Sequence, residues 1–316
     1  MLVAYYFGTS PQLDAYIIGM NIPLLIMHTL AGEALVASFI PIFTGFLAKG
    51  DEREAEKFAC SIINLTTSVF LGLTLICLLF TPFLVKITAP GFSDGTYQLA
   101  IRLTRIMLFS MFFFSLSSIS RSILNSYQNF TAPGLQQTVV NLSIILMMII
   151  GVSFFGIYSL AWGFLIGSVI QFLIQIPALS GRIRYNFKLS LPITNTFFSA
   201  YLPLLLLIPL NQLNILITKI IASMLGSGNI SALSYSEKLM EIANNILAVP
   251  IATVLFPHLS ALVYKKDRET FSRQLKKGMN ILFFATFPIT LFFLFFSEPL
   301  IEVLFKRGAF SSKSVE

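Results

Sequence analysis

Long apolar runs, separated by short polar loops, make up most of the chain. A transmembrane helix needs about 20 mostly apolar residues, and stretches that qualify follow one another along the sequence. They cover residues 15–48, 58–85, 99–120, two segments between 122 and 181, then 189–218, 232–264 and 278–297. Residues 1–8 resemble the second half of a further helix. The pattern predicts an all-α integral membrane protein with about eight full transmembrane helices plus a partial first helix.

The composition supports this interpretation. Of the 316 residues, 56% are hydrophobic and only 11% are charged, whereas soluble domains carry about 25% charged residues. The mean hydropathy is +0.82. The two cysteines, Cys60 and Cys77, form neither a CxxC motif nor a cluster with histidine, so we expect no metal site and no redox chemistry.

The net charge of the chain is +7, and 13 of its 21 basic residues lie in alternate loops. Lys49, Arg53, Arg121, Arg182 and the basic group at 265–277 all fall in loops on one side, and the intervening turns are short and glycine-rich. Positive loops stay in the cytoplasm, so the sequence predicts a multi-pass membrane protein with these loops on the cytoplasmic side and no nucleic-acid partner.

An internal repeat suggests two lobes. Residues 39–41 and 49–51 are similar to residues 255–257 and 265–267 at a constant offset, and both copies have the same predicted membrane orientation. Repeated halves around a central site are typical of secondary transporters; chance similarity between apolar helices is the alternative. We expect an N-terminal lobe over residues 1–188 and the start of a C-terminal lobe over 189–316.

Motifs for catalysis are absent: the sequence has no Walker A loop, no GxSxG and no HExxH. We therefore expect neither an enzyme nor a cofactor. Polar residues within apolar helices are costly in lipid and mark cavities. The substrate-cavity candidates are Asp14, Asn21, His28, Glu33, Gln212, Asn214, Glu237, Lys238 and Glu241.

Two features of these candidates favour a cavity. Asp14, Asn21 and His28 are spaced by seven residues, and Glu237, Glu241 and Asn244 are spaced at i, i+4 and i+7, so each set shares a helix face. The alternatives are a polar face at the bilayer boundary, a local ion pair of Lys238 with either glutamate, and a Lys219 side chain that reaches the interface.

At these positions the sequence resembles the MurJ/MviN lipid II flippase family of the MOP transporter superfamily. The likeness covers nearly the whole chain in order. The motifs that carry it are Asp14-Ala15-Tyr16, Ile22-Pro23, Gly32-Glu33-Ala34-Leu35, Ser38-Phe39-Ile40-Pro41, Ala89-Pro90-Gly91-Phe92, Gln212, Gly226-Ser227-Gly228-Asn229, Tyr235-Ser236-Glu237-Lys238-Leu239, Phe256-Pro257-His258 and Lys306-Arg307-Gly308-Ala309-Phe310.

The resemblance implies a MOP-type two-lobe helical bundle around a cationic cavity, which flips a lipid-linked disaccharide-pentapeptide across the bacterial inner membrane by alternating access. Asp14 then matches a functionally important acid, Lys238 takes the place of a cavity arginine, and Glu237 stands for the acid beside it. The implied partners are the anionic lipid II substrate, membrane lipids and, as an open option, other cell-wall synthesis proteins.

The sequence departs from the family pattern in several places. Met27 and His28 replace expected arginines, and Thr218 replaces an acid linked to sodium. An arginine-containing segment expected before Met1 and the last helices expected beyond Glu316 are not in the sequence, so the resemblance implies an incomplete, truncated bundle.

Two alternatives to a lipid II flippase therefore remain open. One is an exporter of another substrate, a polysaccharide-lipid or a drug, in the same superfamily. The other is a non-transporting degenerate remnant. A cavity lined with acids instead of cationic groups would favour an exporter of organic cations.

Overall fold

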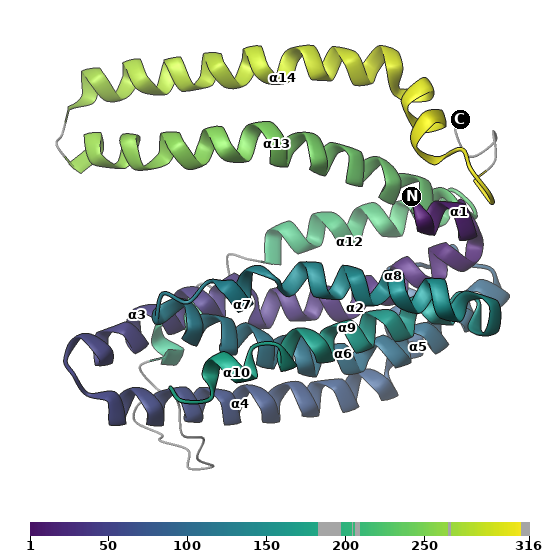
Figure 1. Ribbon diagram of the computed structural model, residues 1–316. Coiled ribbons are helices and arrows are strands. Elements are labelled where there is room, and N and C mark those ends of the chain that lie inside the picture. The colour runs from purple at the N-terminus through teal and green to yellow at the C-terminus, as the bar shows by residue number, and fades with distance from the viewer. Residues whose placement is uncertain (183–196, 204, 206–208, 265–266, 311–316) are drawn as a thin grey trace. The chain divides into compact units, whose positions relative to one another are not determined.

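The computed structural model describes residues 1–182, 197–203, 205, 209–264 and 267–310, and it is built of helices (Figure 1). Within these residues no strand occurs, which confirms the predicted all-α class. The helices are α1 (Leu2–Phe7), α2 (Pro11–Ala31), α3 (Glu33–Ala48), α4 (Glu52–Leu79), α5 (Thr81–Thr88), α6 (Asp94–Ser126), α7 (Thr131–Gly134), α8 (Gln136–Phe155), α9 (Tyr158–Leu173), α10 (Ile176–Leu179), α12 (Pro209–Met224), α13 (Asn229–Tyr264) and α14 (Arg268–Phe305).

Seven segments in the described part of the chain are long and apolar enough to cross a membrane. They are Pro11–Ala48, Glu52–Leu79, Asp94–Ser126, Gln136–Phe155, Tyr158–Leu179, Asn229–Phe256 and Arg268–Phe305. Each overlaps a predicted span. The remaining predicted span, 189–218, falls largely outside the described residues, and α12 overlaps its end. The chain is thus a multi-pass membrane protein, as its apolar pattern predicts.

The helices group into two compact units, one formed by Pro11–Ser227 and one by Met1–Ser10 with Gly228–Glu316. The predicted lobe boundary, between residues 188 and 189, lies outside the described residues. The division into lobes 1–188 and 189–316 therefore stays a prediction.

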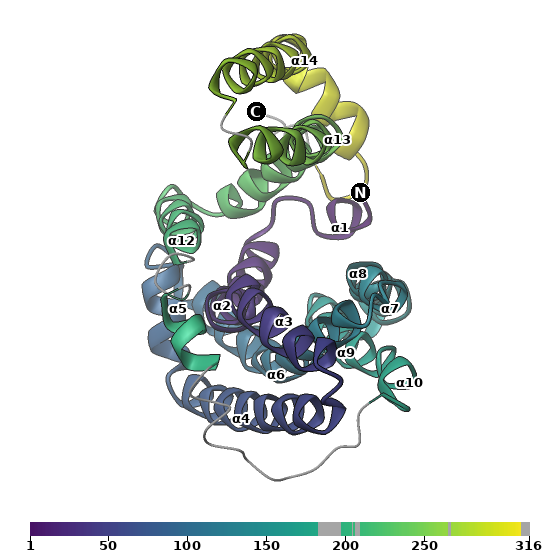
Figure 2. The same cartoon turned by 90° about the vertical axis from the view of Figure 1, so that its left-hand side faces the viewer.

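Helix α6 forms the centre of the Pro11–Ser227 unit, where it packs against α2, α3, α4 and α9 (Figure 2). Its Leu103, Met107 and Met111 are fully buried. The helix is also rich in serine, and hydroxyls such as that of Ser122 donate to carbonyls of the preceding turn. These bonds within the helix let a serine-rich segment be buried without leaving its hydroxyls unsatisfied.

Two glycines bring α8 and α9 close together. A Cβ on Gly163 would lie 2.8 Å from Cα of Ile144, and one on Gly167 would lie 3.0 Å from Cα of Val140. Small residues four positions apart allow the backbones of two membrane helices to approach closely. The pair α8–α9 therefore depends on this Gly163-x-x-x-Gly167 motif.

The segment predicted as one span over residues 15–48 is broken into α2 and α3 at Gly32. A continuous helix over the 38 residues of Pro11–Ala48 would be about 57 Å long, far more than the hydrocarbon thickness of about 30 Å. A Cβ on Gly32 would lie 2.5 Å from the carbonyl oxygen of His28, so the break requires glycine.

Side chains from outside α2 and α3 satisfy the carbonyls at this break. The hydroxyl of Ser118 donates to the carbonyl of Ala31 at 2.7 Å, and the hydroxyl of Tyr201 donates to the carbonyl of Leu30. Helix α6 therefore supports the break directly, through a serine near its C-terminal end.

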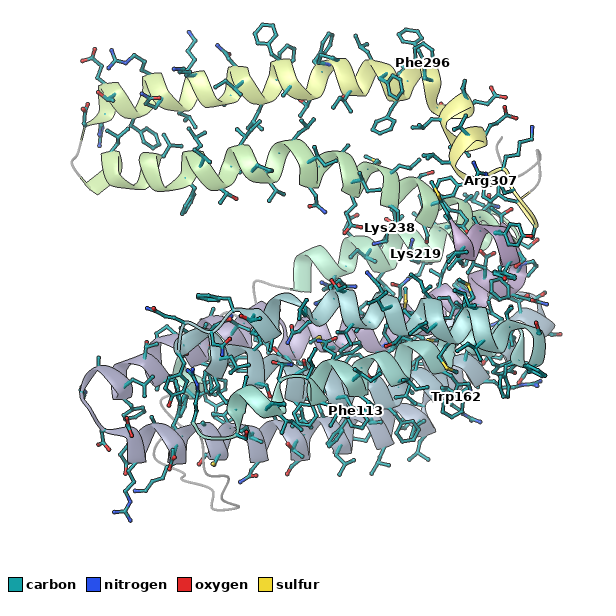
Figure 3. All side chains as sticks on the ribbon, viewed as in Figure 1. Phe113, Trp162, Lys219, Lys238, Phe296 and Arg307 are labelled. Atoms are coloured by element: carbon teal, nitrogen blue, oxygen red, sulfur yellow. The ribbon has the colours of Figure 1, made fainter. Side chains whose placement is uncertain are left out.

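In the other unit, α13 and α14 lie side by side as a helical hairpin (Figure 1). Helix α14 leaves helical geometry at Phe296 (φ −119°, ψ 15°), three residues before Pro299, and Figure 3 labels Phe296 at the resulting bend. Proline removes a backbone donor and clashes with the preceding turn, which accounts for the kink.

The short helix α1 belongs to this same unit. Ala4 is buried with Phe305 and Phe310, and Tyr235 packs against the cluster. The amide of Ala309 donates to the carbonyl of Tyr5 at 2.8 Å. The segment predicted as a partial first helix is thus helical, and it packs against the C-terminal part of α14.

Candidate functional site

The predicted polar residues fall into two places, one in each unit. In the Pro11–Ser227 unit, α2 and α12 enclose a cavity of about 170 Å³, which we call the α2–α12 cavity. Its lining consists of Ile18, Asn21, Ile22, Leu24, Leu25, His28, Thr88, Gln212, Ile215, Leu216 and Lys219. The structure therefore brings together three of the sequence candidates, Asn21, His28 and Gln212.

The spacing of the polar residues explains how two apolar helices form a polar cavity. Asn21 and His28 are seven residues apart on α2, and Gln212 and Lys219 are seven apart on α12. Residues at this spacing lie on one face, two turns apart. On each helix, the two polar residues therefore lie on the cavity side, and apolar lining residues lie between them.

Lys219 is the most notable member of the cavity (labelled in Figure 3) because it is only 3% exposed. The sequence leaves open the alternative that the Lys219 side chain reaches the membrane interface, and it does not place Thr88 in the site. The seven-residue spacing of Gln212 and Lys219 is the feature of the sequence that indicates a shared helix face for the lysine. Thr88, at the end of α5, has no such signal.

The chemistry of the lining favours an anion. The ammonium of Lys219 is a donor only, the amides of Asn21 and Gln212 each supply two N–H donors, and Thr88 supplies a hydroxyl. Among the described residues that line the cavity there is no carboxylate. The ring of His28 adds a further N–H donor.

Three other candidates lie outside this lining. Asp14 is 1% exposed in the first turn of α2, seven residues before Asn21, where the helix dipole favours a carboxylate. Asn214 is exposed on α12. Glu33 is the first residue of α3, and its side chain lies outside the described part of the chain.

The second place is a groove of about 530 Å³ between α13 and α14, which we call the α13–α14 groove. Its polar lining residues are Glu237, Glu241 and Asn244 on α13 and Thr286 and Thr290 on α14. The first three share a face, in agreement with their spacing. The two threonines, four residues apart, were missed because nothing in the sequence indicates which face of α14 lies opposite.

Lys238 does not line this groove. Its ammonium contacts Oε2 of Glu241 at 2.6 Å, and both side chains are more than half exposed. The ion pair is the local alternative considered for this residue, and it offsets the charge of one of the two groove carboxylates. Among the described residues, no group of three or more His, Cys, Asp or Glu is arranged to hold a metal ion.

Comparison with protein families gives a match that spans nearly the whole chain. The family model described as lipid II flippase MurJ matches residues 3–316. A probable lipid II flippase MurJ from Buchnera aphidicola subsp. Schizaphis graminum is 32% identical over 323 residues, covering 100% of this chain and 63% of the relative. The lipid II flippase MurJ of Burkholderia cenocepacia is 29% identical over 325 residues, covering 99% of this chain and 63% of the relative.

Solved structures agree with this result. A lipid II flippase MurJ in an inward closed conformation superposes with a TM-score of 0.87 at 29% identity, covering 99% of this chain and 65% of that one. A multidrug resistance MATE transporter of the MOP superfamily superposes with a TM-score of 0.80 at 16% identity, and that likeness concerns the fold alone. The chain spans less than two thirds of the length of the MurJ relatives it matches.

Proposed function

The chain belongs to the lipid II flippase MurJ family, and from this premise we propose that it moves a lipid-linked anionic cell-wall precursor of the lipid II class across the inner membrane by alternating access. Under this proposal the substrate crosses the membrane chemically unchanged, so the chain acts as a transporter and uses no catalytic residue or cofactor. Its partners are the lipid-linked substrate, the surrounding lipids and, in the cell, other proteins of cell-wall synthesis.

The observation that carries the proposal is the carboxylate-free polar lining of the α2–α12 cavity. A diphosphate-linked lipid needs donors and positive charge within an otherwise apolar passage. Lys219, Asn21 and Gln212 supply these groups. In this account Lys219 provides the positive charge of the cavity.

Complementation tests the proposal. Cells depleted of their own lipid II flippase receive this 316-residue chain, or the chain joined to the remaining part of the Burkholderia cenocepacia relative, which supplies the third of the family length that the chain does not cover. We expect growth with at least one of these proteins. Membrane levels are measured by immunoblotting, and the intact relative is the positive control.

The outcome against the proposal is equally clear. If both proteins reach the membrane at the level of the relative and neither restores growth, while the relative does, the chain does not transport this substrate. Accumulation of lipid-linked precursor in the depleted cells, followed in parallel, separates a transport failure from a general growth defect.

A second candidate function rests on the α13–α14 groove. Glu237 and Glu241 place two carboxylates on its wall, and acids are the groups that an exporter of organic cations needs. Protection of sensitive cells from a cationic dye, lost on Glu237→Gln, would favour this function. No protection, together with rescue of flippase-depleted cells, would exclude it.

A further inference from the structure

A third cavity lies apart from the two places described above. Helices α3 and α6 border a cavity of about 500 Å³, which we call the α3–α6 bay. Its lining consists of Val36, Ala37, Ile40 and Pro41 on α3 and Arg121 and Asn125 on α6. None of these residues belongs to the predicted site, and none lines the α2–α12 cavity.

Contacts at both ends keep the bay open. At one end, Ser118 of α6 bonds to the carbonyl of Ala31 at the break between α2 and α3. At the other end, the rings of Phe43 and Tyr127 meet edge to face at 5.7 Å. The end of α2 is therefore held at α6 before the bay, and α3 is held at Tyr127, the residue that follows α6, after it. The lining residues of α3 lie between these two contacts.

A different face of α3 is also held. Phe39 is fully buried, and its ring stacks on that of Phe58 from α4 at 5.0 Å. Because this face is anchored to α4, α3 cannot approach α6 to fill the bay without breaking an aromatic cluster. The cavity is therefore a feature of the packed fold.

The two walls of the bay differ in chemistry. On α6, Arg121 offers a planar guanidinium, which binds phosphate through paired donors. Asn125 adds an acceptor: its Oδ1 atom is buried and has no hydrogen-bond donor in the described part of the chain. On α3 the wall is apolar, and residues 36–41 span about 7.5 Å along the helix.

The bay lies near the cytoplasmic end of its helices. Arg121 lies within α6, five residues from its end at Ser126, and not in a loop as the charge pattern predicts. The loop that follows α3 carries Lys49 and Arg53, which the charge distribution places in the cytoplasm. Arg182 lies 4.8 Å above the ring of Tyr127 at the same end. Basic pockets between helices on this side attract anionic lipid headgroups.

We propose that the α3–α6 bay binds the headgroup of an anionic phospholipid of the phosphoglycerol type from the cytoplasmic leaflet. Arg121 binds the phosphate, a headgroup hydroxyl donates to Oδ1 of Asn125, and the start of an acyl chain lies along Val36, Ile40 and Pro41. This site is separate from the proposed transport cavity, and its occupation does not require the chain to be a flippase.

Quenching of tryptophan by brominated lipids tests the proposal. Trp162 is the only tryptophan in the chain, so Trp162→Phe combined with Ala37→Trp places a single reporter in the bay. The protein is reconstituted in phosphatidylcholine with increasing fractions of acyl-brominated phosphatidylglycerol or phosphatidylcholine. We expect brominated phosphatidylglycerol to reach half-maximal quenching at a lipid fraction about fivefold lower than brominated phosphatidylcholine does. This is the preference expected of one arginine for an anionic headgroup.

Variants assign the preference to the bay. Arg121→Gln should remove it and Asn125→Leu should weaken it, whereas Arg105→Gln, which alters an exposed arginine on the same helix, should leave it unchanged. Circular dichroism and the thermal midpoint report folding. If the two brominated lipids quench the reporter protein equally while Arg121 is intact, the proposal is overturned. This result does not depend on whether an Arg121 variant folds.

Two further results would also overturn it. One is a preference that persists in a folded Arg121→Gln protein, since another group would then bind the headgroup. The other is relief of quenching by millimolar inorganic phosphate, because the bay would then bind phosphate alone and not a lipid. No effect of inorganic phosphate is the expected result.

Discussion

At the scale of single residues, a buried cation decides what the α2–α12 cavity can bind. Lys219 is 3% exposed in a membrane-embedded unit, where a charged side chain is costly unless it serves a polar site. Methionine has a similar length and no charge, so exchanging the two changes the electrostatics of the cavity with little change in volume.

We expect Lys219→Met to lower the translocation rate by about tenfold or more, the loss that follows removal of one charge-assisted hydrogen bond. The protein should reach the membrane at an unchanged level. Lys57→Met is the matched control, because Lys57 is half exposed and pairs with Glu54 one turn away. An active Lys219→Met protein would remove this lysine from the mechanism.

At the scale of elements, breaks and close approaches between helices position the cavities. The break at Gly32 directs α3 away from the line of α2, and it is stabilised by Ser118 and Tyr201. The pair α8–α9 depends on Gly163 and Gly167. Both features rest on glycines with another backbone close by, so each can be tested against a glycine in open space.

Gly32→Ala should destabilise the protein by about 1–3 kcal/mol, because a Cβ there meets the carbonyl of His28 and the backbone is not helical. Gly45→Ala on α3 should be neutral or stabilising by about 0.5–1 kcal/mol, since a Cβ at Gly45 meets no atom within 4 Å. The thermal midpoint in detergent measures both. Equal midpoints for the two variants would mean that the break does not need glycine.

Gly163→Val should also be destabilising, by about 1–3 kcal/mol, because the added carbons collide with the backbone of α8 near Ile144. Gly72→Val on α4 is the control, since a Cβ at Gly72 meets nothing within 4 Å. A Gly163→Val protein that melts with the parent would contradict the close approach of α8 and α9.

The apolar pattern predicts most of these elements but not their breaks. Mean hydropathy is high wherever a long run of apolar residues occurs, so it predicts where the membrane spans lie. It does not distinguish a single span over the 34 residues 15–48 from two helices joined at a glycine. In the same way, the predicted span 58–85 is α4 followed by α5, with the turn at Phe80.

For the two candidate sites, the sequence predicts the polar residues that share one helix face but not those on the facing helix. Spacing assigns Glu237, Glu241 and Asn244 to one face of α13, and the structure agrees. The residues that complete each site, Thr88 in one and Thr286 and Thr290 in the other, come from a second helix. Periodicity describes one helix at a time, so it cannot predict these partners.

At the scale of the whole molecule, the central claim is that a chain of the MurJ family moves a lipid-linked anion. The family match over residues 3–316 supports the substrate class, and the α2–α12 cavity supplies a lining that suits an anion. The α13–α14 groove, with its two carboxylates, supports the competing possibility of a cationic substrate.

The most direct measurement is translocation in proteoliposomes. The chain, alone and joined to the remaining part of the Burkholderia cenocepacia relative, is reconstituted with a fluorescent lipid II-type precursor, and a membrane-impermeant quencher reports the rate at which the precursor changes leaflet. The account predicts transfer above that of protein-free vesicles, reduced by Lys219→Met and unaffected by an organic cation. Transfer no faster than in protein-free vesicles for both proteins, with the intact relative active in the same assay, would contradict it.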